Sequence, residues 1–150
     1  RLRSYDLIIV GFGLNVAVHG NPDSVMRLYT KNMGKAIGHL REAFPQASIL
    51  VMSVSDRDGR SADGIRTLKE VEHLTAFQQQ MAATTKVSFL NLYQAMGGAG
   101  SMKRLVDKRM ANKDYAHLSY GGGAYVAQKV FSSFTAGLEN YKRRITLEKQ

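Results

Sequence analysis

Apolar residues follow two patterns along this chain, short continuous runs and longer stretches with helical spacing. Three runs have the length of a strand and show no alternation: residues 6–12, 48–54 and 87–93. A continuous apolar run is typical of a strand that is buried on both faces, as in a parallel sheet. Between these runs, residues 22–44 and 67–85 carry apolar side chains every three or four positions, which predicts two helices.

The remaining segments alternate between loops and helices. A polar loop is predicted at residues 55–66, and a glycine-rich loop at 96–100. A short helix near 101–110, a polar segment at 111–118 and a last helix from about 120 to 141 complete the chain. This order, β–α–β–α–β–α–α, predicts the α/β class with a parallel sheet and crossover helices.

A sheet of only three parallel strands is thin and leaves an unpaired edge, and such an edge tends to pair with another strand. The chain also begins with Arg1, without an initiator Met or a signal-peptide pattern. We therefore expect a fragment, a processed product or one piece of a longer protein. Further strands would come from upstream sequence of the same protein or from another chain.

Composition narrows the class without identifying a function. The chain has 150 residues, of which 44% are hydrophobic and 22% charged, as in an ordinary globular domain. No apolar run approaches the roughly 20 residues that a membrane-spanning helix needs. Cysteine is absent, which excludes disulfides and thiolate chemistry but does not decide the compartment.

The net charge of +9 favours anionic partners through long-range attraction. Much of this charge is local to the C-terminal tail or recurs at helical spacing, which fits a solvated basic face. A nucleic-acid surface is the weaker interpretation, because no basic motif interleaved with aromatic residues is present. The histidines outside the C-terminal region have no metal-ligand spacing, so we expect no metal site: His19, His39 and His73.

Ligands of open α/β sheets bind beyond the carboxyl ends of the strands. The loop after the first predicted strand contains Gly13-Leu14-Asn15. Glycine lets the backbone turn sharply, and the Asn15 amide could donate to a developing oxyanion. An ordinary turn built from Gly and Asn is the alternative.

A second group of residues is Asp114-Tyr115-Ala116-His117. A carboxylate three residues before a histidine in a tight turn can accept the Nδ1 proton, which leaves Nε2 free to take a proton from a hydroxyl nucleophile. A surface aspartate beside a capping histidine is the alternative, and the pair by itself is weak evidence.

Together the two groups resemble the SGNH/GDSL family of serine esterases. Gly13-Leu14-Asn15 matches the family block that usually reads Gly-x-Asn-Asp, and Asp114-Tyr115-Ala116-His117 matches the later Asp-x-x-His block. The linking stretches at 5–9, 48–57 and 91–98 also look like members that act on carbohydrate or cell-wall esters. The resemblance covers almost the whole chain. It implies a three-layer α/β/α, flavodoxin-like fold whose N-terminal strand or strands are missing here.

The resemblance also implies roles for individual residues. His117 would be the general base and Asp114 its orienting partner, while Asn15 and Gly13 would form part of the oxyanion hole. No metal or organic cofactor is implied. Two features depart from the family: position 16 is Val where Asp is common, and the Gly-Asp-Ser block with the nucleophile is absent, as is the glycine of the second block.

Other residues near the predicted strand ends could contribute. Asp56, Arg57, Met96 and Gly97 could line a substrate cleft, although local turns explain them as well. Three serines lie near the predicted site, but none is in a Gly-x-Ser-x-Gly elbow: Ser53, Ser55 and Ser119. The glycines at 121–123 fit neither a Walker loop nor a dinucleotide fingerprint.

We therefore predict a hydrolase of short acyl esters, such as O-acetyl groups on a bacterial glycan, whose serine lies upstream of Arg1. Without that serine, this chain alone should not turn over substrate. The likeness weakly favours a bacterial periplasmic or extracellular location. The alternative is a non-catalytic module that binds a glycan or a protein partner on a degenerate form of the same fold.

Overall fold

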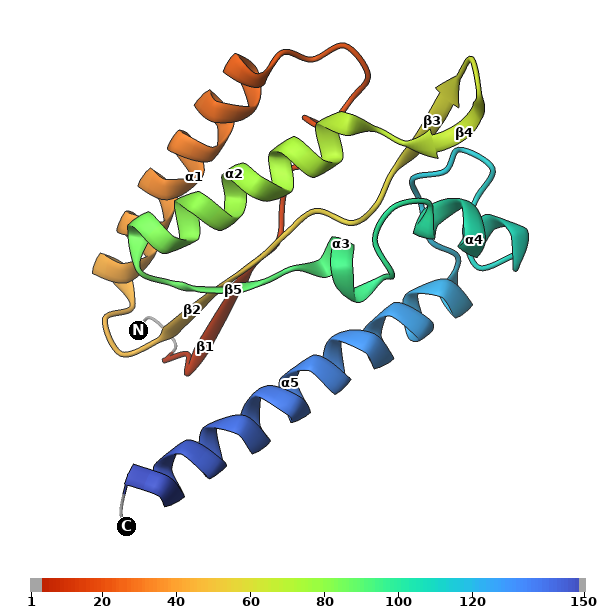
Figure 1. Cartoon of the computed structure of the whole chain (residues 1–150). Coiled ribbons are helices and arrows are strands. Elements are labelled where there is room, and N and C mark those ends of the chain that lie inside the picture. The colour runs from red at the N-terminus through yellow and green to blue at the C-terminus, as the bar shows by residue number, and fades with distance from the viewer. Residues whose placement is uncertain (1–3, 149–150) are drawn as a thin grey trace.

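The computed structural model describes residues 4–148, and they form a mixed α/β fold (Figure 1). The elements are β1 (Leu7–Val10), α1 (Asp23–Ala43), β2 (Ser48–Met52), β3 (Asp58–Ser61), β4 (Gly64–Thr67), α2 (Lys69–Thr85), β5 (Ser88–Leu90), α3 (Leu92–Ala95), α4 (Ser101–Asp107) and α5 (Tyr120–Glu148).

The main sheet contains three parallel strands in the order β1-β2-β5. Helices α1 and α2 cover one face (Figure 1), where Val10 and Val51 pack with Met33, Ile37 and Met81. The predicted fold class and the parallel pairing of the three strands are confirmed. The apolar runs predicted them because each strand buries residues against this helical layer.

Strand β1 lies at an edge of the sheet and its second face is open. Leu7 and Ile9 are 45% and 49% exposed, whereas Val10 is buried. Alternate residues of a strand point to opposite faces, so the side of β1 away from α1 and α2 has no layer covering it among the described residues. In the strand order β1-β2-β5, no strand among residues 4–148 pairs with the outer side of β1, so the unpaired edge that the sequence predicted is present there.

Two predicted segments differ from the structure. The supposed loop at 55–66 contains an antiparallel hairpin of β3 and β4, with Gly64 in a left-handed conformation at φ 108°. The predicted strand at 87–93 ends early, because the Asn91 side chain accepts a hydrogen bond from the Gln94 amide and starts the short helix α3.

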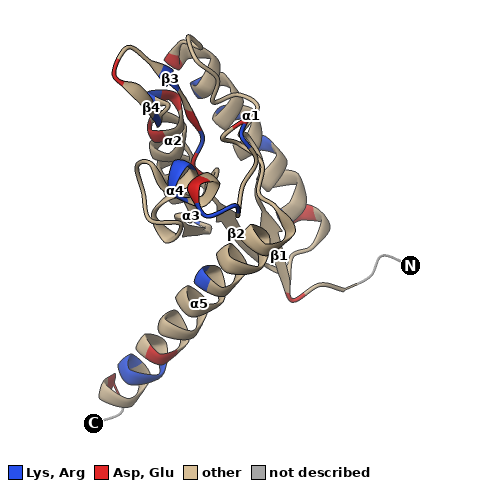
Figure 2. Cartoon of the chain, turned by 90° about the vertical axis from the view of Figure 1, so that its right-hand side faces the viewer, with Lys and Arg blue, Asp and Glu red and all other residues tan. Residues whose placement is uncertain are grey.

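Helix α5 is longer than predicted and packs only near its beginning. A Cβ atom on Gly122 would lie 1.8 Å from the carbonyl oxygen of Met110, so only glycine permits this approach. Val126 is buried in the cluster around Met102 and Leu105. From residue 131 onward nearly every position is exposed, and the C-terminal half extends away from the sheet (Figure 2).

Candidate functional site

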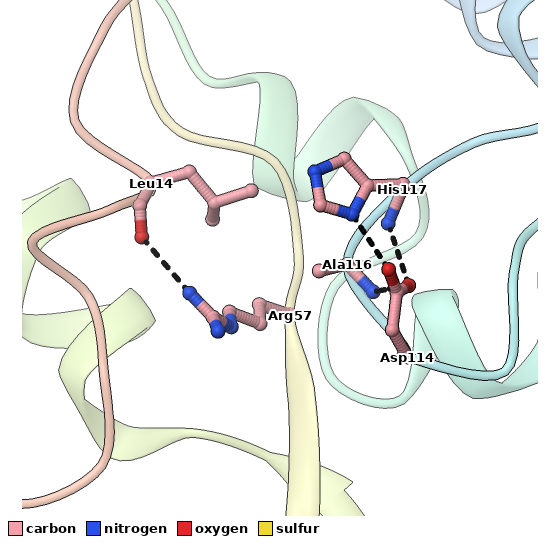
Figure 3. Close-up of polar contacts among 5 residues, drawn as sticks. All are labelled: Leu14, Arg57, Asp114, Ala116 and His117. Carbon is pink, nitrogen blue, oxygen red and sulfur yellow. Dashed lines mark hydrogen bonds and ion pairs between the residues drawn. The ribbon is translucent and has the colours of Figure 1, made fainter.

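The Asp114–His117 turn forms a hydrogen-bonded acid–histidine pair (Figure 3). His117 Nδ1 donates to Asp114 Oδ2 at 2.7 Å. The other carboxylate oxygen accepts the backbone amides of Ala116 at 3.0 Å and His117 at 3.1 Å. Because Nδ1 carries the proton of this bond, Nε2 of the neutral ring is left as a proton acceptor. The ring is 75% exposed, so a substrate or another segment can reach it.

The carboxylate of Asp114 is held in its ionised form. The hydrogen bond from the His117 side chain, followed by those from the amides of Ala116 and His117, lowers the pKa of Asp114 to about 2. Hydrogen bonds donated to a carboxylate stabilise its charged state. Asp114 is therefore a charged acceptor for His117 throughout the neutral pH range.

The turn keeps its shape through its own backbone. Tyr115 adopts a left-handed conformation at φ 56°, and its amide donates to the Asn112 carbonyl at 3.0 Å. The Asn112 amide in turn donates to the His117 carbonyl at 2.8 Å. An antiparallel bridge between Ala111 and Leu118 closes the loop. These backbone bonds hold the Asp114 carboxylate within hydrogen-bond distance of His117 Nδ1.

The hydroxyl of Ser119, one of the serines near His117, forms a hydrogen bond with the backbone of helix α5. Its Oγ accepts the amide of Gly122 at 3.2 Å in the first turn of α5. This is the bond of a helix N-cap, which satisfies an otherwise free amide. Ser119 therefore begins the helix that follows the site.

The Gly13–Asn15 loop begins two residues beyond the end of β1, after Gly11 and Phe12. The Val16 amide donates to the Gly13 carbonyl at 2.8 Å and forms a tight turn around Leu14 and Asn15. Gly13 has φ 122°, a conformation that L side chains rarely adopt. Asn15 is exposed, and within residues 4–148 its side chain makes no hydrogen bond. Both amide protons are therefore free to meet a ligand.

One segment contacts both the Gly13–Asn15 loop and the acid–histidine turn. Arg57 Nη1 donates to the Leu14 carbonyl at 3.4 Å (Figure 3). The next residue, Asp58, donates its amide to the Tyr115 carbonyl at 3.1 Å. Residues 57 and 58 therefore link the two predicted halves of the site. A role of Arg57 in lining a substrate cleft stays a prediction.

Asp56 does not line a cleft, contrary to the expectation from sequence. Its side chain is fully buried, with an exposed fraction of 0%. Oδ2 accepts the Ser101 hydroxyl at 3.0 Å and the Met102 amide at 2.9 Å, and Oδ1 accepts the Thr67 hydroxyl at 2.9 Å. A buried carboxylate needs such partners, so Asp56 stabilises the junction of α4 with the β3–β4 hairpin.

Asp58 is a second buried carboxylate beside Asp56. It accepts the Lys103 amide at 2.6 Å. The Thr67 hydroxyl lies 3.0 Å from Asp58 Oδ1 and 2.9 Å from Asp56 Oδ1, so its one proton is shared between the two carboxylates. Burial, and then the negative charge of Asp56, raise the pKa of Asp58 above its ordinary value. The pair fixes the segment that carries Arg57.

Met96 and Gly97 were also expected at a cleft. Met96 is buried in the cluster that includes Met102 and Leu105, so that expectation is wrong for Met96. Gly97 is exposed, and its carbonyl accepts a hydrogen bond from Arg104 at 2.9 Å. The role of Gly97 at a cleft stays a prediction.

Gln78, a fully buried residue of α2, was not predicted from the sequence. Its Nε2 donates to the Phe12 carbonyl at 2.8 Å, and its Oε1 accepts the Val54 amide at 3.0 Å. The side chain thus joins the loops that follow β1 and β2. A glutamine at helical spacing with the buried positions Leu74 and Met81 is the signal that could have identified it.

A pocket of about 180 Å³ lies between the loops that follow β1 and β2. Its lining consists of Gly11, Phe12, Gly13, Leu14, Met52, Ser53, Val54, Ser55 and Leu92. Ser53 is buried; its hydroxyl donates to the Val54 carbonyl at 3.1 Å and accepts the Tyr93 amide at 3.3 Å. The Ser53 hydroxyl is therefore both donor and acceptor in hydrogen bonds inside the protein.

Two negative observations concern residues 4–148. They contain no group of three or more His, Cys, Asp or Glu side chains that could hold a metal ion. None of their helices is both long enough and apolar enough to cross a membrane.

Comparison with known proteins gives a structural similarity. No family model matches the sequence, and no curated protein sequence matches it. A solved structure of a peptidoglycan O-acetylesterase is similar over 90% of this chain, with a TM-score of 0.76 and 23% sequence identity. This chain spans 38% of the length of that protein. At this identity the similarity establishes the fold alone, an α/β arrangement of a three-stranded parallel sheet and helices.

Proposed function

We propose that this chain is the C-terminal part of a serine ester hydrolase domain of the SGNH/GDSL type. The observation that carries the proposal is the 2.7 Å bond between His117 Nδ1 and Asp114, which leaves Nε2 of an exposed ring available as a base. The similarity in fold to an O-acetylesterase supports the same chemistry.

In the proposed reaction, His117 Nε2 takes the proton of a serine hydroxyl as that oxygen attacks the acyl carbonyl. Asp114 stabilises the imidazolium that forms, and Asn15 donates its amide to the tetrahedral oxyanion. Collapse of this intermediate expels the alcohol, which receives the proton from His117. Water then hydrolyses the acyl-enzyme with the same base.

The serine is proposed to come from an upstream segment of the same protein. The open edge of β1 and the exposed side chains of Leu7 and Ile9 provide a surface for another strand and its helix. A parallel strand added there would end beside the Gly13–Asn15 loop, because the carboxyl ends of parallel strands meet at one edge. We expect the reading frame before Arg1 to encode a Gly-Asp-Ser sequence.

The proposed substrate is a short-chain acyl ester, such as an O-acetyl group on a bacterial glycan. The similar solved protein is a peptidoglycan O-acetylesterase, and the net charge of +9 suits an anionic glycan. No step in this chemistry requires a metal or an organic cofactor.

The test is hydrolysis of p-nitrophenyl acetate by the full-length protein and by its His117→Ala variant. We expect kcat/KM to fall on the order of 10³-fold or more on loss of the base. His73→Ala is a matched control, because His73 Nδ1 pairs with Asp23 at 2.8 Å on the helical layer. Retained activity in His117→Ala would exclude its role as base, and an inactive full-length protein would favour a non-catalytic binding module.

A further inference from the structure

Gln78 has a buried carboxamide whose nitrogen and oxygen each form a hydrogen bond. It lies on α2, and its two partners belong to different loops, the Phe12 carbonyl after β1 and the Val54 amide after β2. One partner accepts a hydrogen bond and the other donates one. A carboxamide can serve both at once, whereas a carboxylate only accepts and a thioether forms at most weak bonds.

The backbone of Gly13, the residue after Phe12, lies against the Gln78 side chain. A Cβ atom on Gly13 would lie 3.3 Å from Gln78 Nε2, 3.3 Å from Leu74 and 3.0 Å from the Tyr29 ring. The Gly13 backbone therefore fits closely between α1 and α2. Because Gly13 also accepts the Val16 amide, the position of this backbone sets the turn that presents Asn15.

We infer that Gln78 is the positioning residue of the Gly13–Asn15 loop and that it aims the Asn15 amide at the reacting carbonyl. This inference rests on the proposed function. Gln78 touches neither substrate nor nucleophile; it acts through the Phe12 carbonyl, while its bond to Val54 fixes the loop relative to the end of β2. Arg57 holds the same loop at a second point, the Leu14 carbonyl.

The experiment compares Gln78→Met in two backgrounds of the full-length protein, wild type and Asn15→Ala, with p-nitrophenyl acetate. A loop misplaced by about 1 Å costs roughly 10²-fold in rate, so we expect Gln78→Met to lower kcat about 10- to 100-fold with little change in KM. In the Asn15→Ala background, the same substitution should cost less than about twofold, since the donor that Gln78 positions is already absent.

A merely structural role predicts equal losses in both backgrounds, and that result would overturn the inference. Unchanged kcat in Gln78→Met would overturn it as well. Gln79→Met is the control, because Gln79 is exposed on the same helix. Gln78→Glu is the second variant if Gln78→Met does not fold; it keeps an acceptor for Val54 but loses the donor to Phe12, and we expect a similar fall in kcat.

Amide hydrogen exchange separates failure of this inference from failure of the proposed function. If Asn15→Ala leaves kcat unchanged, Asn15 is not an oxyanion donor, and activity no longer reports on Gln78. The Val16 amide, which closes the turn, should still exchange at least about tenfold faster in Gln78→Met than in Gln79→Met. Equal Val16 exchange in the two variants would show that Gln78 does not hold the loop.

Discussion

The amide of Asp58 donates a hydrogen bond to the Tyr115 carbonyl at 3.1 Å, and so ties the acid–histidine turn to the segment after β2. The preceding residue, Arg57, holds the Leu14 carbonyl. Two neighbouring positions in the sequence thus contact two loops that lie about 100 residues apart. The relative placement of Asn15 and His117 depends on this short segment.

Arg57→Leu should lower kcat/KM of the full-length esterase roughly two- to tenfold, the value of one net hydrogen bond. The loss arises because the Gly13–Asn15 loop then has no hydrogen bond from Arg57 at the Leu14 carbonyl. Arg60→Leu is a suitable control, since Arg60 is exposed on β3. A larger effect of Arg60→Leu than of Arg57→Leu would contradict the linking role.

Asp114→Asn should lower kcat on the order of 10³- to 10⁴-fold, because the amide no longer stabilises the tautomer with a proton on Nδ1. Steady-state kinetics with p-nitrophenyl acetate measures this. Asp107→Asn is the control, since Asp107 pairs with Lys103 in an exposed ion pair on α4. A loss below about tenfold in Asp114→Asn would remove Asp114 from the proposed triad.

The stabilising effect of Asp114 should disappear only in strong acid. Its pKa is lowered from 3.8 to about 2, so folding favours the ionised form. Its contribution to the free energy of unfolding is fully present above about pH 4 and is lost as pH falls from there through about 2. Urea unfolding of wild type and Asp114→Asn at several pH values measures it. If the difference in free energy of unfolding between wild type and Asp114→Asn already becomes smaller between pH 7 and pH 5, the lowered pKa of Asp114 is contradicted.

Asp56→Ala should reduce the free energy of unfolding by about 3 kcal/mol, because it leaves the Ser101 hydroxyl and the Met102 amide without their buried acceptor. Asp63→Ala is the control, since Asp63 pairs with Arg66 at the surface. That change should cost at most about 1 kcal/mol. Equal effects in chemical denaturation would show that Asp56 is not the anchor of this junction.

The sequence predicted the parts of the fold that depend on apolar periodicity. The strands at Leu7–Val10 and Ser48–Met52 and the helices α1 and α2 lie where the runs and spacings placed them. The Asp114–His117 bond was also predictable, because a spacing of three residues in a tight turn limits where the two side chains can lie. These features are local in the chain.

Features that depend on distant contacts were not predictable. Asp56 looked like a charged loop residue, yet it is buried because its partners, Ser101 and Met102, lie 45 and 46 residues away. The β3–β4 hairpin pairs residues at most nine positions apart and is local, but it has no alternating apolar pattern from which strands could be predicted. Its ladder stabilises it, together with the buried Asp58, which accepts the Lys103 amide 45 residues away. The contacts of Gln78 were also not predictable, because its two partners lie on separate loops 24 and 66 residues away.

The close contact of Gly122 with the Met110 carbonyl, together with the buried side chain of Val126, fixes the first two turns of α5, and the rest of the helix projects from there. From that contact to residue 148 the helix rises about 39 Å at about 1.5 Å per residue. A tilt of the helix axis by about 10° at Gly122 would therefore move residue 148 by about 7 Å. A methyl group added at Gly122 would displace the C-terminal half of the helix far more than the residues it touches.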